Sequence, residues 1–381
     1  MTTRFILFSF SLILSLSVLG QNKPKMKDML RDSTDGAMDL SDFLIEMHGF
    51  IPMPQLITEP ALGGFGAMFA PVFIKPNKVK VKGRYVAPDI TAAFGAYTAN
   101  KTWMVGAMRM ATLAKLKMKY RVAAGYGDVN MDFYRNLPIV GEKRFGFNFN
   151  ATVIYASVLK ELGNTNVYVG IEYLFLNNKV SPDFSDLHLP DFLSDKELNS
   201  NLSSFGLDAE YDMRDNMFTP NKGLYITSNY RINANWTGSD YDYQNLSVSL
   251  FQFFQTTPKL VSGFRLDTKF QFGDAPFYAK PSISLRGVPM SRYQGNEIYT
   301  VETEQRYDFT KRWSLLLFGG LAKAPTEKIN FDQSLLVHNY GTGFRYLIAR
   351  KFKLRVGVDV AWSNSDFGWY IVFGSAWNNR G

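Results

Sequence analysis

Alternation of apolar and polar residues is the feature of this sequence that most limits its fold. It dominates from about residue 62 to the C-terminus, and a clear example is the run in which Phe264, Leu266, Phe270 and Phe272 alternate with Arg265, Asp267, Lys269 and Gln271. Successive side chains of a β-strand point to opposite faces of the sheet, so a period of two predicts strands with one apolar and one polar face. We therefore expect an all-β protein.

A water-soluble β-sandwich would alternate in the same way, but two details favour a membrane protein. The apolar faces are bulky and aromatic over about ten residues per strand, the length with which a tilted strand crosses a bilayer. The polar faces carry charges of both signs, as the wet lumen of a barrel does. Only a closed barrel pairs all the backbone groups of strands in lipid. The prediction is an antiparallel transmembrane β-barrel.

The pattern places sixteen strands along the chain. Bacterial barrels alternate short periplasmic turns with longer outer loops, and here the short connections (87–89, 113–114, 257–258, 310–311 and 349–351) all lie between even and odd strands. The long ones (127–144, 178–202, 273–297 and 323–334) all lie on the opposite side, which supports the count and predicts that strand 1 runs outward. The predicted strands are 62–73, 78–86, 90–99, 101–112, 115–126, 145–157, 165–177, 203–214, 223–236, 243–256, 260–272, 298–309, 312–322, 335–348, 352–362 and 367–377.

The N-terminal part of the sequence differs in composition. Arg4 precedes an apolar core from Phe5 to Leu19, and Gly20 provides a cleavage site before Gln21, so residues 1–20 are interpreted as a signal peptide. An uncleaved anchor helix is the alternative, which the short core disfavours. Residues 21–58 are acidic and end in a proline-bearing turn; they are expected to form a short periplasmic or plug-like segment. The barrel is then predicted to occupy residues 59–381.

Composition and motifs argue against other classes of function. The net charge of +8 is interleaved along the chain rather than clustered, which disfavours nucleic-acid binding, and an exported chain without cysteine cannot rely on disulfides. The three histidines are far apart, and the sequence has no nucleophile elbow or phosphate-binding loop. Asp183, Asp186, Asp191 and Asp195 could bind a divalent ion, but a solvated acidic loop is the better interpretation. We predict no catalysis, no metal and no cofactor.

Five motifs resemble those of a known family. They are the turn from Asp212 to Gly223, the loop sequence Leu285-Arg286-Gly287-Val288, the strand motif Glu304-Gln305-Arg306, the strand motif Gly341-Thr-Gly-Phe-Arg345, and the closing strands 354–361 and 373–377. In this order they resemble the BamA/TamA-type bacterial surface-antigen superfamily. The resemblance implies a sixteen-stranded outer-membrane barrel that inserts or translocates other proteins.

The resemblance also implies roles for individual residues. In the family, the loop arginine folds back into the lumen and meets acidic side chains of neighbouring strands, so Arg286 and Gly287 are expected to contact Glu302, Glu304 and Asp359. We call these five residues the loop clasp. A guanidinium suits this role because it stays charged and offers a planar fork to a carboxylate. The turn motif is carried by Arg214, Asp215, Asn216, Pro220 and Gly223.

The sequence departs from the family pattern in two places. Related chains carry several periplasmic POTRA domains, whereas residues 21–58 are too few to form even one, because such a domain needs a core of its own. Strand 13 of related chains also offers an acidic residue, whereas Leu316-Leu-Phe-Gly-Gly320 offers none. The first departure bears on how substrates are handled, and the second on which residue is the partner of Arg286.

Glycines point to a lateral seam. Strand 1 was placed over Ala61-Leu-Gly-Gly-Phe-Gly-Ala67, and glycine weakens strand pairing. In the family, the junction between the first and last strands opens to accept or release a client strand, so Gly63, Gly64, Gly66 and Gly374 are candidate seam residues. The alternative is that these glycines only make room for aromatic neighbours or for the N-terminal segment.

The leading functional hypothesis is an integral outer-membrane barrel that acts in outer-membrane protein assembly or transport with a separate partner. Its expected partners are the lipid of the bacterial outer membrane and other outer-membrane or periplasmic proteins. The alternatives are a passive pore or structural membrane component without insertase activity, and a soluble secreted β-sandwich.

Overall fold

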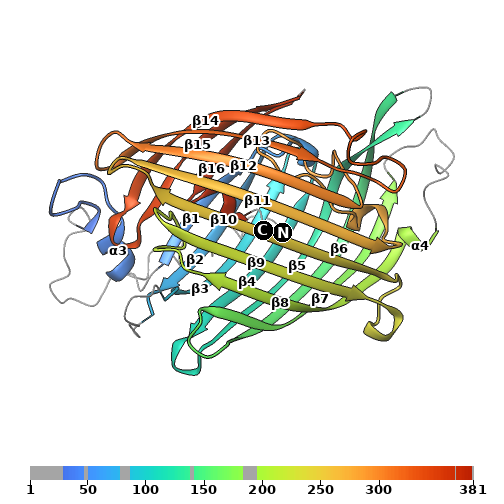
Figure 1. Ribbon diagram of the computed structural model, residues 1–381, viewed down its shortest axis with the longest axis horizontal. Helices are drawn as coiled ribbons and strands as arrows, with labels where there is room; N and C mark the ends of the chain where they lie inside the picture. Colours follow the sequence, from blue (N-terminus) through green and yellow to red (C-terminus); the bar gives the residue numbers. More distant parts are fainter. Residues whose placement is uncertain are drawn as a thin grey trace, which may run out of the picture.

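The computed structural model describes residues 29–46, 50–77, 86–137, 141–182, 195–364 and 366–379. They form one sixteen-stranded sheet in which every strand pairs antiparallel with the next strand of the sequence. Figure 1 shows these strands tilted and wrapped around a common axis. The protein is a nearly closed antiparallel β-barrel with the predicted number of strands.

Within the described residues, the strands and the α-helices α3 and α4 have the following bounds. The strands are β1 (Phe50–Ile57), β2 (Gly66–Lys75), β3 (Asp89–Thr98), β4 (Trp103–Leu113), β5 (Met118–Leu137), β6 (Gly141–Glu161), β7 (Val167–Pro182), β8 (Asn199–Asp212), β9 (Gly223–Asn233), β10 (Tyr243–Gln255), β11 (Leu260–Gly273), β12 (Glu297–Asp308), β13 (Trp313–Lys323), β14 (Val337–Ala349), β15 (Leu354–Ser363) and β16 (Phe367–Phe373). The helices are α3 (Ser41–Glu46) and α4 (Asp195–Leu198). Among the described residues, no helix is long and apolar enough to cross a membrane.

The two ends of the barrel differ in their connections. Connections from even to odd strands, such as 114–117, 256–259, 309–312 and 350–353, are mostly short, and we call this end the short-turn rim. Connections from odd to even strands include 183–198, 274–296 and 324–336, and we call that end the long-loop rim. This is the predicted parity.

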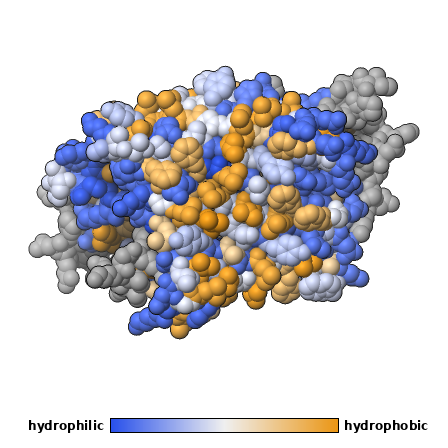
Figure 2. All heavy atoms as spheres, in the orientation of Figure 1, coloured by the Kyte–Doolittle hydropathy of each residue, from blue (hydrophilic) through white to orange (hydrophobic). Residues whose placement is uncertain are grey.

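Strand β11 illustrates how the alternating sequence builds the two faces of the wall. Phe264 and Leu266 are exposed on the outside, whereas Arg265 and Asp267 between them are buried on the inside. Other exposed outer residues are also apolar, including Phe205, Leu207, Leu315, Leu317 and Phe344. Figure 2 shows apolar residues gathered over the middle of the visible wall, with hydrophilic residues more frequent at both ends. An apolar outer band of this kind is the surface that a transmembrane barrel presents to lipid.

The start of the barrel differs from the prediction. The first strand is β1, which lies within the range 21–58 that was expected to be a separate segment, and the predicted strand at 62–73 corresponds to β2. The predicted strand at 78–86 falls almost entirely outside the described residues, and β2 pairs directly with β3. Pro52 and Pro54 were interpreted as a turn, but an edge strand tolerates proline. The sheet thus begins one strand earlier than predicted and still contains sixteen strands.

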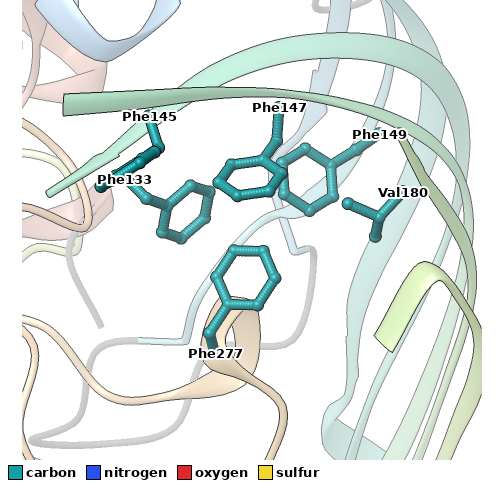
Figure 3. Close-up of a cluster of buried hydrophobic side chains, with 6 residues drawn as sticks. All are labelled: Phe133, Phe145, Phe147, Phe149, Val180 and Phe277. Atoms are coloured by element: carbon teal, nitrogen blue, oxygen red, sulfur yellow. The ribbon is translucent and has the colours of Figure 1, made fainter. Parts of the chain in front are cut away.

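A long hairpin was also underestimated. Strands β5 and β6 have 20 and 21 residues, and they continue through most of the predicted loop at 127–144. Figure 3 shows why: the rings of the hairpin lie together on one face and pack with Phe277 of the loop between β11 and β12. The cluster is almost fully buried, and its members are Phe133, Phe145, Phe147, Phe149, Val180 and Phe277. Burial of these rings supports strand pairing beyond the barrel wall.

The end of the chain turns into the barrel. The last strand ends at Phe373 rather than at the predicted residue 377, and Gly374 follows it with a φ of +79°. This left-handed conformation favours glycine and redirects the chain. Trp377 is consequently buried, and its ring packs against Phe251 and Phe253 of β10.

Candidate functional site

The loop between β11 and β12 carries the centre of the site. It spans residues 274–296, and its apolar side chains form a buried cluster with the barrel wall, made of Ile283, Leu285, Val288, Ile298, Ala322 and Val337. Arg286 lies between two of these anchoring residues and is completely buried. The apolar neighbours therefore hold the loop while the arginine points to the charged inner wall.

Arg286 reaches all three carboxylates that the sequence analysis named. Its Nη1 donates to Glu304 Oε2 at 2.7 Å and to Asp359 Oδ2 at 2.9 Å. Its Nη2 and Nε donate to Glu302 Oε1 at 3.0 and 3.2 Å. The guanidinium also stacks 3.4 Å from the centre of the Phe318 ring. Phe318 belongs to strand β13, whose stretch 316–320 has no acidic residue, and it contributes a cation–π contact to Arg286.

The backbone next to Arg286 is bonded to three strands. Gly287 N donates to the Tyr370 hydroxyl of β16 at 2.8 Å, and Ser363 Oγ of β15 donates to Gly287 O at 2.8 Å. Asn339 Nδ2 of β14 donates to Arg286 O at 2.9 Å. Gly287 has a φ of +84°, a conformation that favours glycine. Through these bonds the loop tip is tied to the last strands of the barrel.

The carboxylates of the loop clasp have further partners. Arg345 Nη2 donates to Asp359 Oδ2 at 2.9 Å, and a second bond from its Nη1 makes the pair bidentate. Glu302 Oε2 accepts from the Trp377 indole at 2.7 Å and from Arg265 Nη1 at 3.2 Å. The side chains named in this paragraph, Arg265, Glu302, Arg345, Asp359 and Trp377, are all buried. A charge network in a water-poor interior is stable only when each member is paired, so the clasp depends on every one of these contacts.

Several of these partners were not identified from the sequence. Arg345 is the last residue of the motif Gly341-Thr-Gly-Phe-Arg345, and Arg265 alternates with apolar residues in β11. The alternation therefore indicated that both side chains point into the barrel. For Phe318, the sequence showed only that residues 316–320 contain no acidic side chain. Trp377 gave no signal, because it was assigned to the last strand. Tyr370 sits in a strand of mixed apolar residues, where nothing marks a contact with the loop.

The turn motif folds as a compact unit at the short-turn rim. Arg214 donates to Asp212 through two nitrogens, at 2.7 and 2.9 Å, and Asp215 Oδ1 accepts from the backbone of Asn221 at 2.8 Å. Asn216 Oδ1 accepts from the backbone of Phe218 at 2.8 Å. Asp and Asn side chains commonly fix turns in this way.

The same turn contacts distant strands. Asn216 Nδ2 donates to Phe352 O at 3.2 Å, Lys353 donates to Asp215 at 3.0 Å, and Pro220 O accepts from Arg306 at 3.4 Å. Because the turn joins β8 to β9 and residues 350–353 join β14 to β15, these bonds cross the short-turn rim. Gly223 has a φ of +115°, and a Cβ there would lie 2.2 Å from Met213 O. The turn therefore requires glycine at this position.

An acidic N-terminal segment, residues 31–46, binds the short-turn rim. Arg312 donates to Asp32 at 2.6 Å and to Asp35 at 2.8 Å, and it also contacts Asp39. Arg350 binds Asp32, and its backbone N donates to Asp39 at 3.0 Å. A hydrogen bond from Arg350 lowers the pKa of Asp32, and one from Arg312 lowers the pKa of Asp35. Burial raises the pKa of Asp39, but hydrogen bonds from Arg312 and Ser41 outweigh it and the net pKa is lowered.

Apolar contacts complete this attachment. Leu44 of α3 is buried in a cluster with Ile51 of β1, Ile74 of β2, Ala349 of β14 and Leu354 of β15. The N-terminal segment thus packs against β1 and β2 at the start of the sheet and against β14 and β15 near its end, at the short-turn rim.

The seam is the junction between β1 and β16. Within the described residues no backbone ladder joins these two strands, and the hydroxyl of Thr58, the residue that follows β1, donates to Trp369 O of β16. Gly374 follows β16 directly, and its backbone N donates to Arg355 O of β15 at 2.7 Å, on the side of β16 away from the seam. Gly63 and Gly64 instead lie in the turn between β1 and β2, and Gly66 begins β2, where it pairs with both neighbouring strands. The expected position of these three glycines in the seam strand was wrong, because β1 begins earlier in the chain.

The described residues give no support to a metal site. Among them, no group of three or more acidic or histidine side chains is arranged to hold a metal ion. Of the four aspartates considered as ligands for a divalent ion, Asp183, Asp186 and Asp191 lie outside the described residues, and Asp195 begins helix α4.

Comparisons with known proteins agree with this geometry. The Omp85 superfamily domain matches residues 99–292, just over half of the 381 residues. The fold is similar to BamA from Haemophilus ducreyi lacking POTRA domains 1–3, with a TM-score of 0.57 and 11% identity over 84% of this chain and 69% of that chain. It is also similar to CdiB from Escherichia coli (TM-score 0.59, 10% identity, 84% and 61%) and CdiB from Acinetobacter baumannii (TM-score 0.53, 10% identity, 84% and 58%). The chain spans less than two thirds of either CdiB chain. No curated protein sequence matches it.

Proposed function

Since this chain belongs to the Omp85 superfamily, we propose that it is an integral protein of the bacterial outer membrane that inserts or translocates other proteins with a separate partner. In this arrangement the short-turn rim faces the periplasm and the long-loop rim faces outward. The apolar outer band contacts lipid. The working part is a lateral gate at the seam, through which a client strand enters or leaves the barrel.

The observation that carries this proposal is the seam itself. Fifteen strand junctions in the described sheet are backbone ladders, whereas β1 and β16 are not joined by one. β16 has only seven residues. Unpaired strand edges are sites where another chain can add a strand, and natural proteins otherwise cover or shorten them. A junction without a ladder in a membrane barrel is therefore a place of low opening cost.

The loop clasp has a structural role in this proposal. Arg286 holds the loop against Glu302, Glu304 and Asp359, and Gly287 binds Tyr370 of the seam strand β16. In the lumen the loop contacts β16 through Gly287, and Trp377 packs against β10 and donates to Glu302 of β12. The clasp fixes the last strands so that opening is confined to the seam. A lumen occupied in this way favours a gated insertase over a passive open pore.

A disulfide across the seam tests the gate. The chain has no cysteine, so Thr58→Cys with Trp369→Cys creates a single pair at the position where the two strands touch. Val72→Cys with Ala92→Cys, which joins neighbouring strands that already share a ladder, is the matched control. Each variant is expressed as the only copy, and the amounts of other outer-membrane proteins are measured.

We expect oxidation of the seam pair to lower these amounts and reduction to restore them, with no effect in the control. Full function with the seam oxidised would exclude the gate. If depletion of the protein leaves outer-membrane proteins unchanged but alters solute uptake, the passive-pore alternative is correct.

A further inference from the structure

The two edges of the seam differ in chemistry because of proline. Strand β1 has the sequence Phe50-Ile-Pro-Met-Pro-Gln-Leu-Ile57, with prolines at 52 and 54, and β2 contains Pro71. Proline has no backbone N–H and cannot donate to a ladder. The direction in which each nitrogen points therefore decides which junction loses hydrogen bonds.

The strand register answers this question. Pro52 lies directly opposite Pro71, and Pro54 lies opposite Phe69. In an antiparallel ladder, pairs that exchange two hydrogen bonds alternate with pairs whose backbone groups point away from each other. Two opposed prolines cannot exchange hydrogen bonds, so Pro52 and Pro71 form a pair whose backbone groups point away from each other. Pairs two residues apart are of the same type, so this also holds for Pro54 and Phe69. The nitrogens of Pro52 and Pro54 consequently point to the open edge of β1.

The junction between β2 and β3 provides an independent check. The same alternation directs the nitrogen of Pro71 to β3, where its missing donor should interrupt the ladder. The register there runs to Phe69 opposite Gly95 and resumes at Val72 opposite Ala92, with Ala70 and Pro71 unpaired between them. The interruption falls where the assignment places it.

The open edge of β1 is therefore poor in donors. Of its seam-facing positions from 50 to 56, only Phe50 and Leu56 carry an N–H, and they are six positions apart. A strand rises about 3.3 Å per residue, so an incoming strand would meet no donor over roughly 20 Å. Prolines on an edge are a known means of preventing strand addition. The edge of β1 resists a pairing partner.

The open edge of β16 has no such defect. The contact from Thr58 to Trp369 O shows that the backbone of Trp369 faces the seam, and alternation gives Phe367, Ile371 and Phe373 the same direction. Strand β16 contains no proline, so all four positions carry a backbone N–H and a carbonyl, and the carbonyl of Trp369 becomes available when its bond from Thr58 breaks. Its far side is held by a ladder with β15. This edge is a short but complete template.

We propose that an extended segment of a client polypeptide pairs with the edge of β16 when the seam opens, and that Pro52 and Pro54 prevent the same pairing on β1. This rests on the proposed gate. The ligand is recognised mainly by its backbone, so its sequence is free apart from the alternation that lipid and lumen require. The prolines also keep β1 from closing permanently on β16.

Two matched proline substitutions test the proposal. Ile371→Pro removes a seam-facing donor from β16, and Leu56→Pro removes one from β1; neither donor belongs to an existing ladder in this assignment. Each variant is the only copy in host cells, and the probe is an eight-stranded outer-membrane barrel of the same host, produced from a plasmid. Folded probe is measured by its heat-dependent gel mobility.

We expect Ile371→Pro to lower the amount of folded probe about tenfold, the factor that corresponds to about 1.4 kcal/mol for one lost backbone hydrogen bond, whereas Leu56→Pro stays within about twofold. A second measurement does not depend on how the proline variants fold. Ile371→Cys and Leu56→Cys are each combined with cysteines scanned along the terminal strands of the probe. Disulfides should form from position 371 and not from position 56.

The outcomes separate the two claims. Loss of folding in Leu56→Pro with disulfides from position 56 would overturn the assignment of the edge, although the gate would stand. If folded probe does not depend on the wild-type protein at all, the proposed function fails, and this inference fails with it.

Discussion

Replacing Arg286 with alanine is expected to destabilise the barrel strongly. The substitution removes the hydrogen bonds to Glu302, Glu304 and Asp359 and the contact with the Phe318 ring. The carboxylates of Glu302 and Asp359 are completely buried, and that of Glu304 is 12% exposed. Water therefore cannot replace the lost guanidinium.

The size of the effect follows from this burial. Removing one partner of a buried charge pair costs about 3–5 kcal/mol, because an uncompensated charge stays inside. A urea slope of about 2–3 kcal/mol per molar turns this into a fall of roughly 1–2 M in the unfolding midpoint. The measurement is urea unfolding of the purified barrel in lipid, followed by the loss of its heat-dependent gel mobility.

Arg144→Ala is the matched control, since Arg144 pairs with Asp132 at 3.4 Å but its side chain is 67% exposed. An exposed pair contributes about 0–1 kcal/mol, so this variant should unfold almost like the wild type. A double-mutant cycle with Glu304→Gln should give a coupling of about 1–3 kcal/mol with Arg286. If Arg286→Ala lowers the midpoint no more than Arg144→Ala does, the clasp does not stabilise the loop and the reasoning is refuted.

Three further predictions concern the loop tip and the rim. Gly287→Ala places a Cβ 3.1 Å from Ala361 O at a φ of +84°, and it should lower the free energy of unfolding in urea by about 1–3 kcal/mol. Gly36→Ala is the control, because Gly36 has a φ of +66° with open space around it, and it should lower this free energy less. Equal losses of stability would show that the close contact with Ala361 does not matter. Arg312→Gln should release residues 31–46 to limited proteolysis, while Lys351→Gln, which removes an exposed pair with Asp42, should not; unchanged protection in Arg312→Gln would contradict the role of the three aspartates. The pKa values of Asp32, Asp35 and Asp39 are lowered in the folded protein. The stability that these carboxylates contribute is therefore complete above the unfolded pKa of about 3.9 and is lost as pH falls through the lower folded values. Hydrogen exchange of residues 31–46 should accelerate only below about pH 4, and acceleration near pH 6 would contradict this assignment.

The class of the fold was readable from the sequence because it depends on a local property. Side chains of a strand face lipid and lumen alternately. The directions of Phe264 and Arg265 can therefore be predicted without reference to any other strand. The loop clasp was expected from the family resemblance, which rests on the short motif around Arg286, together with the inward positions that alternation gives to Glu302 and Glu304. The geometry then showed these side chains within hydrogen-bonding distance.

Which strands form the seam was decided only by the tertiary structure. Pro52 and Pro54 indicate a turn in any local interpretation, and they become compatible with a strand only because β1 lies at the end of the sheet, where no neighbour needs their N–H groups. The burial of Trp377 likewise depends on the change of chain direction at Gly374 and on packing against Phe251 and Phe253 of β10. The attachment of Asp32 to Arg312 joins residues 280 positions apart. Alternation determines which side chains of a strand face lipid or lumen. The neighbours of each strand, and therefore the two strands that form the edges of the sheet, are fixed only when all strands have paired.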